Sequence, residues 1–443
     1  IDTSNNSAEF KALGTLNVTT RRGGNEFHAA VFDYYTSGAT RAANPFSKTK
    51  SNTPFHGLGT SWSGPVYLPK LYDGRNKSFW FVSYETAFGP ASPNFFNTTA
   101  PPAVWRQGDF SRESAVVRDP FNNGLPFTNN QIPPERISTA AKQYFPFWPQ
   151  PNVGDPNRAS GLNYNSLFMA PYSKTHNAQV RFDHQISQRN TIFGRYLFNR
   201  QLARYPDGID AYLGYGGTIR RVRHILVSDT HIFSPTSINE FRFGASLDSL
   251  PWENTLVNGP SFIKAAGLTN VTSDGIIPDV PMVPLVSFSS GAGIPSIYPT
   301  AYEPMGQSRT FQWQDTVSKI TGKHSIRTGF ELNWRHGNTQ QQPDDLLGSY
   351  EFSNRYTGFN FADFLLGIPT TISRSAYHPA RYDRQIAYDF FFQDNYKITN
   401  RLTLNLGLRY ELHPGWTTSG MRISAFDSKS GSIVVPDSAL PLV

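Results

Sequence analysis

Arginine and glutamate share one side-chain parity along two stretches of alternating sequence, and these are the residues here best able to contact a charged solute. Arg327 and Glu331 lie in one stretch, and Arg409 and Glu411 lie in the other. In a β-strand, residues separated by an even number of positions point to the same face, so each pair would share one face. Such side chains could line a pore or contact a solute. Alternatively, they form a ladder of interior salt bridges that fixes the strands.

Other residues that could hold an ion are better explained as ordinary surface groups. The ten histidines are dispersed; His176 and His184 share a parity but would lie about 26 Å apart along one strand. Asp344 and Asp345 stand together in the turn-like stretch QQPDDLLG and could chelate Ca²⁺, but we favour a solvated loop tip. We therefore predict no metal site and no cofactor.

Catalytic motifs are absent from the sequence. It contains no Gly-x-Ser-x-Gly elbow, no His-Glu-x-x-His, no phosphate loop and no dinucleotide fingerprint. Tryptophans could stack on sugars, but aromatic residues near strand ends more simply form girdles at a membrane boundary. These tryptophans are Trp62, Trp80, Trp105, Trp148 and Trp334. We predict that the protein is not an enzyme.

Composition narrows the class of protein. Only 38% of the 443 residues are hydrophobic, yet 14% are aromatic, a combination that suits a β-protein with large half-buried faces. The formal charge is +7, but the basic residues are scattered, and the densest groups are only Arg21–Arg22 and Arg220–Arg223. We therefore predict no nucleic-acid partner. Without cysteine the chain has no disulfide, no cysteine-bound zinc and no thiol catalysis.

Alternating runs joined by tight turns organise the chain. The turns are expected near residues 188, 235, 322 and 400, and the clearest strand is Leu402–Leu412, which has leucine or tyrosine at every second position. These runs are about ten to twelve residues long, which is longer than usual for a soluble sandwich. Long Pro- and Gly-rich connections occupy about 88–174 and 249–307; loops of this length are uncommon in compact domains. The short apolar stretch FADFLLG (Phe361–Gly367) is expected to form a helical turn within a loop.

The absence of an apolar run of about 18 residues excludes a transmembrane helix but leaves a transmembrane β-barrel possible. The opening stretch LNVTTRRGGNEFHAAVFDYY has two alternating runs that meet at Gly23-Gly24-Asn25. Glycine and asparagine tolerate positive φ, so we expect a turn there. Long strands, tight turns at one end and long loops at the other are typical of an outer-membrane barrel.

Several motifs resemble TonB-dependent outer-membrane transporters, especially the large Oar-like receptors of acidobacteria. The opening stretch resembles their junction between plug and barrel. FHGLGTSWSGPVYLPKLYDGRNKSFWFVSYE (Phe55–Glu85) is similar to their next hairpin, and GDFS, NNQIPPERIS and PFWPQPN are similar to their first long outer loop. FADFLLGIP and FFQDNYKITNRLTLNLGLRYEL are similar to a later loop and hairpin.

The resemblance implies an all-β, antiparallel transmembrane barrel in the outer membrane. Residues 1–20 would be the end of a plug domain, and residues 21–443 the first part of the barrel, with about 12 of about 22 strands. Arg21, Arg22, Gly23 and Gly24 would form the plug–barrel junction, and Arg327, Glu331, Arg409 and Glu411 would face the lumen. We expect an internal fragment, with a signal peptide, a coupling box and most of the plug before it and further strands after it.

The implied function is energised uptake of a scarce solute: an iron chelate, cobalamin, an oligosaccharide or a peptide. The implied partners are outer-membrane lipid, a small solute ligand and the periplasmic TonB protein, reached through the region before Ile1. One alternative is an outer-membrane adhesin or export barrel without energised transport. Another is a soluble β-rich enzyme acting on polysaccharide, in which the Leu402–Leu412 face packs against another sheet.

Overall fold

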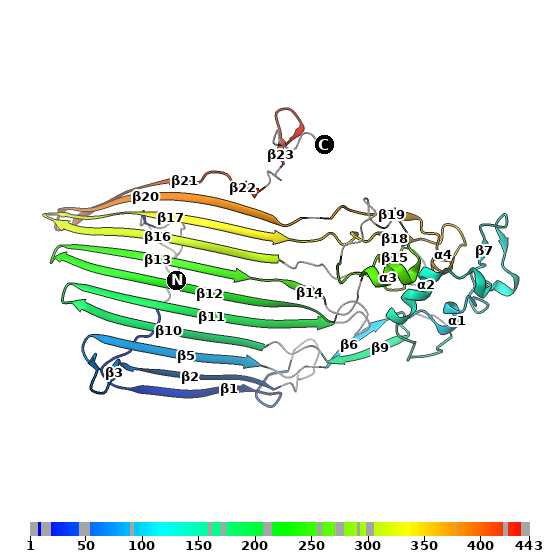
Figure 1. Ribbon diagram of the computed structural model, residues 1–443, viewed down its shortest axis with the longest axis horizontal. Helices are drawn as coiled ribbons and strands as arrows, with labels where there is room; N and C mark the ends of the chain where they lie inside the picture. The colour runs from blue at the N-terminus through cyan, green and yellow to red at the C-terminus, as the bar shows by residue number, and fades with distance from the viewer. Residues whose placement is uncertain are drawn as a thin grey trace.

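One large antiparallel sheet dominates the structure (Figure 1). The computed structural model describes residues 8–9, 19–43, 54–88, 93–157, 162–169, 174–206, 215–254, 259–269, 271, 279–289, 293–297, 305–377, 379–419 and 424–435. Over these residues the sheet has 13 strands, and each strand of its main path is antiparallel to its neighbours. The predicted antiparallel β fold is confirmed.

The strands of the main path follow the chain order. They are β1 (His28–Thr36), β2 (Phe55–Pro65), β5 (Ser78–Phe88), β10 (Lys174–Ser187), β11 (Asn190–Pro206), β12 (Tyr215–Ser234), β13 (Ser237–Ser249), β16 (Met305–Thr321), β17 (His324–Gln340), β20 (Arg381–Thr399) and β21 (Leu402–Leu412). Two short strands pair beside this path, β14 (Trp252–Asn254) with β12 and β22 (Thr417–Thr418) with β20. None of the described helices is long and apolar enough to span a membrane.

The four predicted tight turns are confirmed. Each leaves two residues between paired strands, at 188–189, 235–236, 322–323 and 400–401. Gly322 adopts a φ of 57°; two-residue hairpin turns favour positive φ, which glycine adopts readily and residues with a Cβ resist. All four turns lie at one end of the sheet, and the helices lie beyond the other end (Figure 1).

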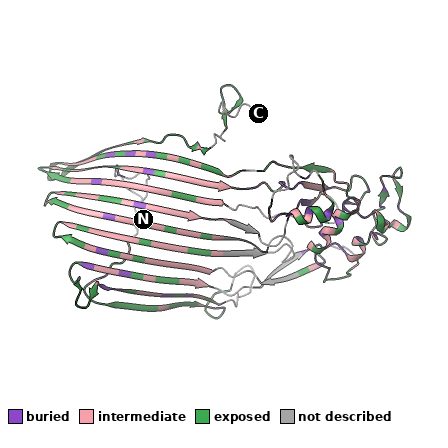
Figure 2. Cartoon of the chain, in the orientation of Figure 1, coloured by how far each residue is buried: buried purple, intermediate pink, exposed green. Residues whose placement is uncertain are grey.

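One face of the sheet is apolar and the other is polar, and this difference continues across the strands. Residues paired across strands share a face, so the register defines rows that cross the sheet. One row is apolar or aromatic throughout: Ala29, Trp62, Val82, Val180, Tyr196, Ile225, Ala245, Phe311, Trp334 and Ile386. We call the face that carries this row the apolar face and the opposite one the polar face. Figure 2 shows exposed and less exposed residues alternating along the strands.

The long connections fold into a unit that we call the cap, at the end of the sheet opposite the tight turns (Figure 1). Its helices are α1 (Ala103–Arg106), α2 (Thr139–Tyr144), α3 (Gly259–Ala266) and α4 (Asn360–Leu366), with the 3-10 turns η1 (Thr128–Asn130), η2 (Pro134–Arg136) and η3 (Phe145–Phe147). Its strands are β6 (Pro93–Thr98) with β9 (Tyr164–Met169), β7 (Arg118–Asp119) with β8 (Leu125–Pro126), and β15 (Leu285–Phe288) with β18 (Ser349–Phe352) and β19 (Thr371–Ser373). The predicted helical turn is α4.

An aromatic core joins the three connections that form the cap. Trp105 and Trp148 come from the first connection, Val286 from the second, and Phe361 and Phe364 from the third, between β17 and β20. All five side chains are at most 2% exposed. Two further hairpins lie outside the cap, β3 (Tyr67–Leu68) with β4 (Tyr72–Asp73) and β23 (Ala425–Asp427) with β24 (Ser432–Val434).

Candidate functional site on the polar face

The described N-terminal residues lie against the polar face near β20 and β21. The backbone N–H of Ala8 donates to Oε1 of Gln393 at 3.0 Å. A Cβ placed on Gly407 would lie only 2.9 Å from the Cβ of Ala8. The absence of a side chain at Gly407 therefore lets the segment approach the strand closely.

Glu9 is the main anchor of this segment. Its side chain is only 3% exposed, and its carboxylate pairs with both terminal nitrogens of Arg327, at 2.8 and 3.0 Å. A two-point contact between a guanidinium and a carboxylate fixes orientation as well as charge. The carbonyl of Glu9 accepts a hydrogen bond from Nη1 of Arg409 at 2.9 Å. Two of the four predicted lumen residues thus hold one N-terminal residue.

A second anchor lies further along the chain. Nη1 of Arg181 donates to Oγ1 of Thr20 at 2.9 Å and to its carbonyl at 3.3 Å. Arg181 also pairs with Asp183 at 2.6 Å and lies over the ring of Phe193, 4.2 Å from its centroid. The paired carboxylate and the ring support the guanidinium in the orientation in which Nη1 reaches Thr20.

A cavity of about 570 Å³ lies between Thr19–Thr20 and the sheet. Its walls include Arg181, Arg195, His224 and Arg242. Nε of Arg195 and Nδ1 of His224 are buried, with no hydrogen-bond partner in the described part of the chain. Nε of Arg195 is a donor in every state, so it favours a ligand or water that supplies an acceptor oxygen; Nδ1 of His224 donates or accepts according to the tautomer.

The predicted junction does not have the positive φ angles that we expected of a turn there. None of Gly23, Gly24 and Asn25 has a positive φ. A Cβ on Gly23 would lie 2.4 Å from the carbonyl oxygen of Trp80 and 2.8 Å from that of Gly64, so glycine is needed here for close approach to β2 and β5. The strand expected at Leu16–Val18 lies outside the described residues.

The other junction residues divide between a cavity and solvent. Arg21 lines a second cavity of about 670 Å³ between the segment and strands β1 to β12. Arg22 and Gly24 are not buried, and nothing lies within 4 Å of a Cβ built on Gly24. Asn25 bonds to Asn76, accepting from its backbone N–H at 2.7 Å and donating to its side chain at 2.6 Å. Of the four junction residues, Gly23 alone is buried, and it is the one that approaches β2 and β5 closely.

The four predicted lumen residues lie on the polar face of adjacent strands, but they do not form one cluster. Glu331 and Glu411 stand in one row with Asp389 between them, and Glu331 accepts a hydrogen bond from Asn333 at 2.5 Å. Arg409 bridges Asp389 at 2.9 Å and Glu411 at 2.8 Å. Of the four predicted residues, only Arg409 and Glu411 form an ion pair with each other, whereas Arg327 pairs with Glu9.

Sequence reasoning missed three partners: Glu9, Asp389 as a contact of Arg409, and His413. Asp389 has the parity of the polar face, and His413 continues the parity of Arg409 and Glu411 two residues past them. Parity was the available signal for both. For Glu9 there was none, because its partners are more than 300 residues away in sequence.

The remaining candidate ligands do not converge. His176 contacts the hydroxyl of Tyr84 at 2.6 Å and His184 that of Ser78 at 2.7 Å, so the two histidines have separate partners. Asp345 accepts a hydrogen bond from Ser373 at 3.2 Å within the cap.

A long-stranded antiparallel sheet, apolar on one face and charged on the other, is the architecture of an outer-membrane barrel. The chain belongs to the outer membrane beta-barrel domain family, whose model matches residues 19–441. It is therefore a protein of the outer membrane. No curated protein matches the sequence.

Solved structures with similar folds are outer-membrane receptors and transporters. The siderophore receptor PirA from Acinetobacter baumannii is 11% identical, with a TM-score of 0.41 over 90% of this chain and 41% of its own. The transporter YddB from Escherichia coli is 8% identical, with a TM-score of 0.40 over 86% of this chain and 36% of its own. The ferric-catecholate import receptor Fiu from E. coli is 13% identical, with a TM-score of 0.36 over 87% and 50%. The chain thus spans half or less of the length of each.

Proposed function

We propose that this chain is the plug end and first barrel strands of an Oar-like, TonB-dependent transporter that takes up a scarce solute with energy. The observation that carries the proposal is the set of contacts between the N-terminal residues and the polar face. Glu9 pairs with Arg327 and Arg409, and Thr20 with Arg181. In a gated pore, residues on the lumen side must be held in place until they are released, and contacts of this kind would hold them.

The anchors suit a segment that is held and then released. Arg327 is 42% exposed, so water can replace part of its bond to Glu9 when the segment moves. Thr20 accepts two hydrogen bonds from Arg181 and the Glu9 carbonyl accepts one from Arg409, and each of these bonds to a charged donor is worth a few kcal/mol at most. A mechanical pull on the N-terminal side, relayed by TonB through the preceding region, could break such contacts one after another.

The cavity beside Thr19 and Thr20 is the proposed place of solute contact. Its donors come from Arg181, Arg195, Arg242 and His224, so it favours a solute rich in acceptor oxygens or negative charge. Iron chelates, cobalamin, oligosaccharides and peptides all carry such groups. On the opposite face, the apolar rows would contact outer-membrane lipid.

A second candidate is an adhesin or export barrel without energised transport, which the cap favours. Its three connections share one aromatic core, so the cap presents a fixed surface suited to a contact partner. The soluble-enzyme alternative required the Leu402–Leu412 face to pack against another sheet. All six apolar side chains of that face are 39–71% exposed, so this requirement is not met.

The coding DNA on both sides of the stretch that encodes residues 1–443 tests the proposal. We expect a plug with a coupling box upstream, and further alternating strands ending in an aromatic residue downstream. A gene with natural ends close to Ile1 and Val443, or one without a plug, would contradict energised transport and favour the adhesin.

A further inference from the structure

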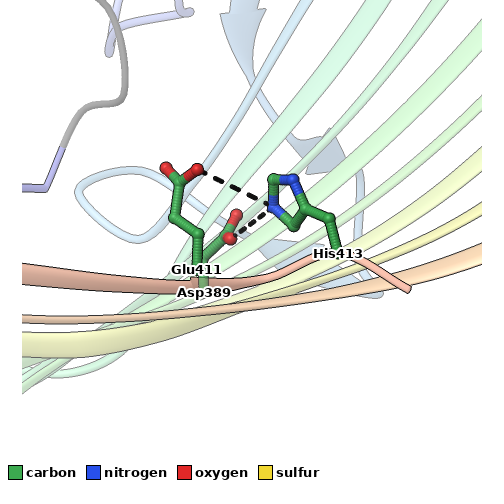
Figure 3. Close-up of side chains that lie close together, drawn as sticks. All are labelled: Asp389, Glu411 and His413. Carbon is green, nitrogen blue, oxygen red and sulfur yellow. Dashed lines mark hydrogen bonds and ion pairs between the residues drawn. The ribbon is translucent and has the colours of Figure 1, made fainter. Parts of the chain in front are cut away.

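One group of side chains on the polar face, about midway along β20, has the composition of a metal site. Asp389 on β20, Glu411 on β21 and His413 just after β21 direct their ligand atoms toward one another (Figure 3). These atoms all lie within 4.8 Å of one another, and no other group of three such residues was found in the described part of the chain. We propose that the three residues bind one divalent transition-metal ion.

Small side-chain rotations would bring the donor atoms of the three residues to the separations found in a metal centre. Nε2 of His413 lies 2.7 Å from Oδ1 of Asp389 and 4.0 Å from Oε2 of Glu411. Ligand bonds of about 2.1 Å in tetrahedral geometry place two donors about 3.4 Å apart. The observed values lie on either side of this separation, so rotations about the Glu411 and His413 side-chain bonds suffice.

Arg409 orients the two carboxylates as a residue that hydrogen-bonds to metal ligands, without binding the metal itself, would do. It donates to Oδ2 of Asp389 at 2.9 Å and to Oε1 of Glu411 at 2.8 Å. Each carboxylate thus turns its other oxygen toward His413. Hydrogen bonds of this kind to the far oxygen of a ligand are the usual support of metal sites, and Arg409 also offsets one of the two negative charges.

The donor set selects the class of ion. One imidazole nitrogen and two carboxylate oxygens suit zinc and its transition-metal neighbours. Ca²⁺ requires six to eight oxygen ligands, which three side chains do not supply. The side chains of Glu411 and His413 are 27% and 26% exposed, so an ion can enter and a water or solute oxygen can complete its coordination. This inference is independent of energised transport.

Zinc titration of the full chain in detergent micelles, followed by isothermal calorimetry, tests the proposal. We expect one saturable Zn²⁺ site per chain, and at least about tenfold weaker binding in His413→Ala. His324→Ala is the matched control: His324 contacts Asp394 at 2.7 Å but belongs to no group of three among the residues that the structure describes, so its removal should leave Zn²⁺ binding unchanged.

Far-UV circular dichroism checks that the variants fold. If His413→Ala loses its strand signal, the near-isosteric Glu411→Gln replaces it and should weaken Zn²⁺ binding in the same way. No saturable Zn²⁺ binding to the unmodified chain would mean that the residues form an ion-paired triad only. Equal effects of His413→Ala and His324→Ala, or Ca²⁺ binding in preference to Zn²⁺, would also overturn the proposal.

Discussion

Leu408 and Asn405 of β21 lie on opposite faces of the sheet, and a charged substitution at each position can test this assignment. Leu408 is 71% exposed on the apolar face and pairs with Phe392, while Asn405 lies on the polar face opposite Asn395. We expect Leu408→Arg to destabilise the folded barrel by about 2–4 kcal/mol, because a guanidinium would enter lipid, and Asn405→Arg to cost much less. Urea titration of folding into lipid vesicles measures both. Equal costs would contradict the assigned faces.

In the cap, Asp119 links stability to pH. Both its oxygens accept hydrogen bonds from Arg136, and this contact lowers the pKa of Asp119 below its usual value. Because the folded pKa lies below the unfolded pKa of about 3.9, the contribution is fully present above about pH 5. It is lost as pH falls through the folded value.

We therefore measure the amide exchange rates of residues 118–127, corrected for the intrinsic effect of pH. The corrected rates should not change with pH near neutrality, and they should rise in strong acid as this stretch opens. Asp119→Asn should already open this stretch at pH 7 and should remove the acid-dependent part. A variant that keeps the same acid dependence would show that another carboxylate is responsible.

Among the elements, the strands and hairpins were predictable because their pattern is local. Alternation of side chains and two-residue turns gave the four hairpins and the faces of β17, β20 and β21. The cap was less predictable, because its core joins residues such as Trp105, Val286 and Phe361 from three separate connections. Only α4 gave a local signal, in its apolar run ending at Gly367, which has a φ of 71°.

Helix α4 is the central element of the cap, and truncating one of its core side chains should destabilise all three connections. Phe361 is fully buried, and its ring centroid lies 5.7 Å from that of Trp105 and 6.0 Å from that of Trp148. We expect Phe361→Ala to destabilise the cap by about 3–5 kcal/mol, with faster hydrogen exchange in each connection and an unchanged sheet. Phe121→Ala, at a side chain that is 69% exposed, is the control. Exchange confined to α4 would contradict a shared core.

Over the whole molecule, parity placed Arg327, Glu331, Arg409 and Glu411 on one face, but it gave no information about what covers that face. The partner of Arg327 and Arg409 is Glu9, which lies at the other end of the chain. Contacts at such separation depend on the three-dimensional path of the segment, and the sequence near Glu9 has no pattern that shows it. The proposed function therefore depends on whether the residues around Glu9 occupy the polar face.

A disulfide between the segment and β21 measures this most directly. The chain has no cysteine, so an engineered pair has no competitor. Ala8 and Gly407 are close enough to be bridged after a shift of about 1 Å, whereas Leu408 faces the other side of the sheet. In outer membranes, Ala8→Cys with Gly407→Cys should form a reducible cross-link upon oxidation, seen as a gel shift, and Ala8→Cys with Leu408→Cys should not. No cross-link in the first pair, or equal cross-linking in both, would contradict a segment seated on the polar face.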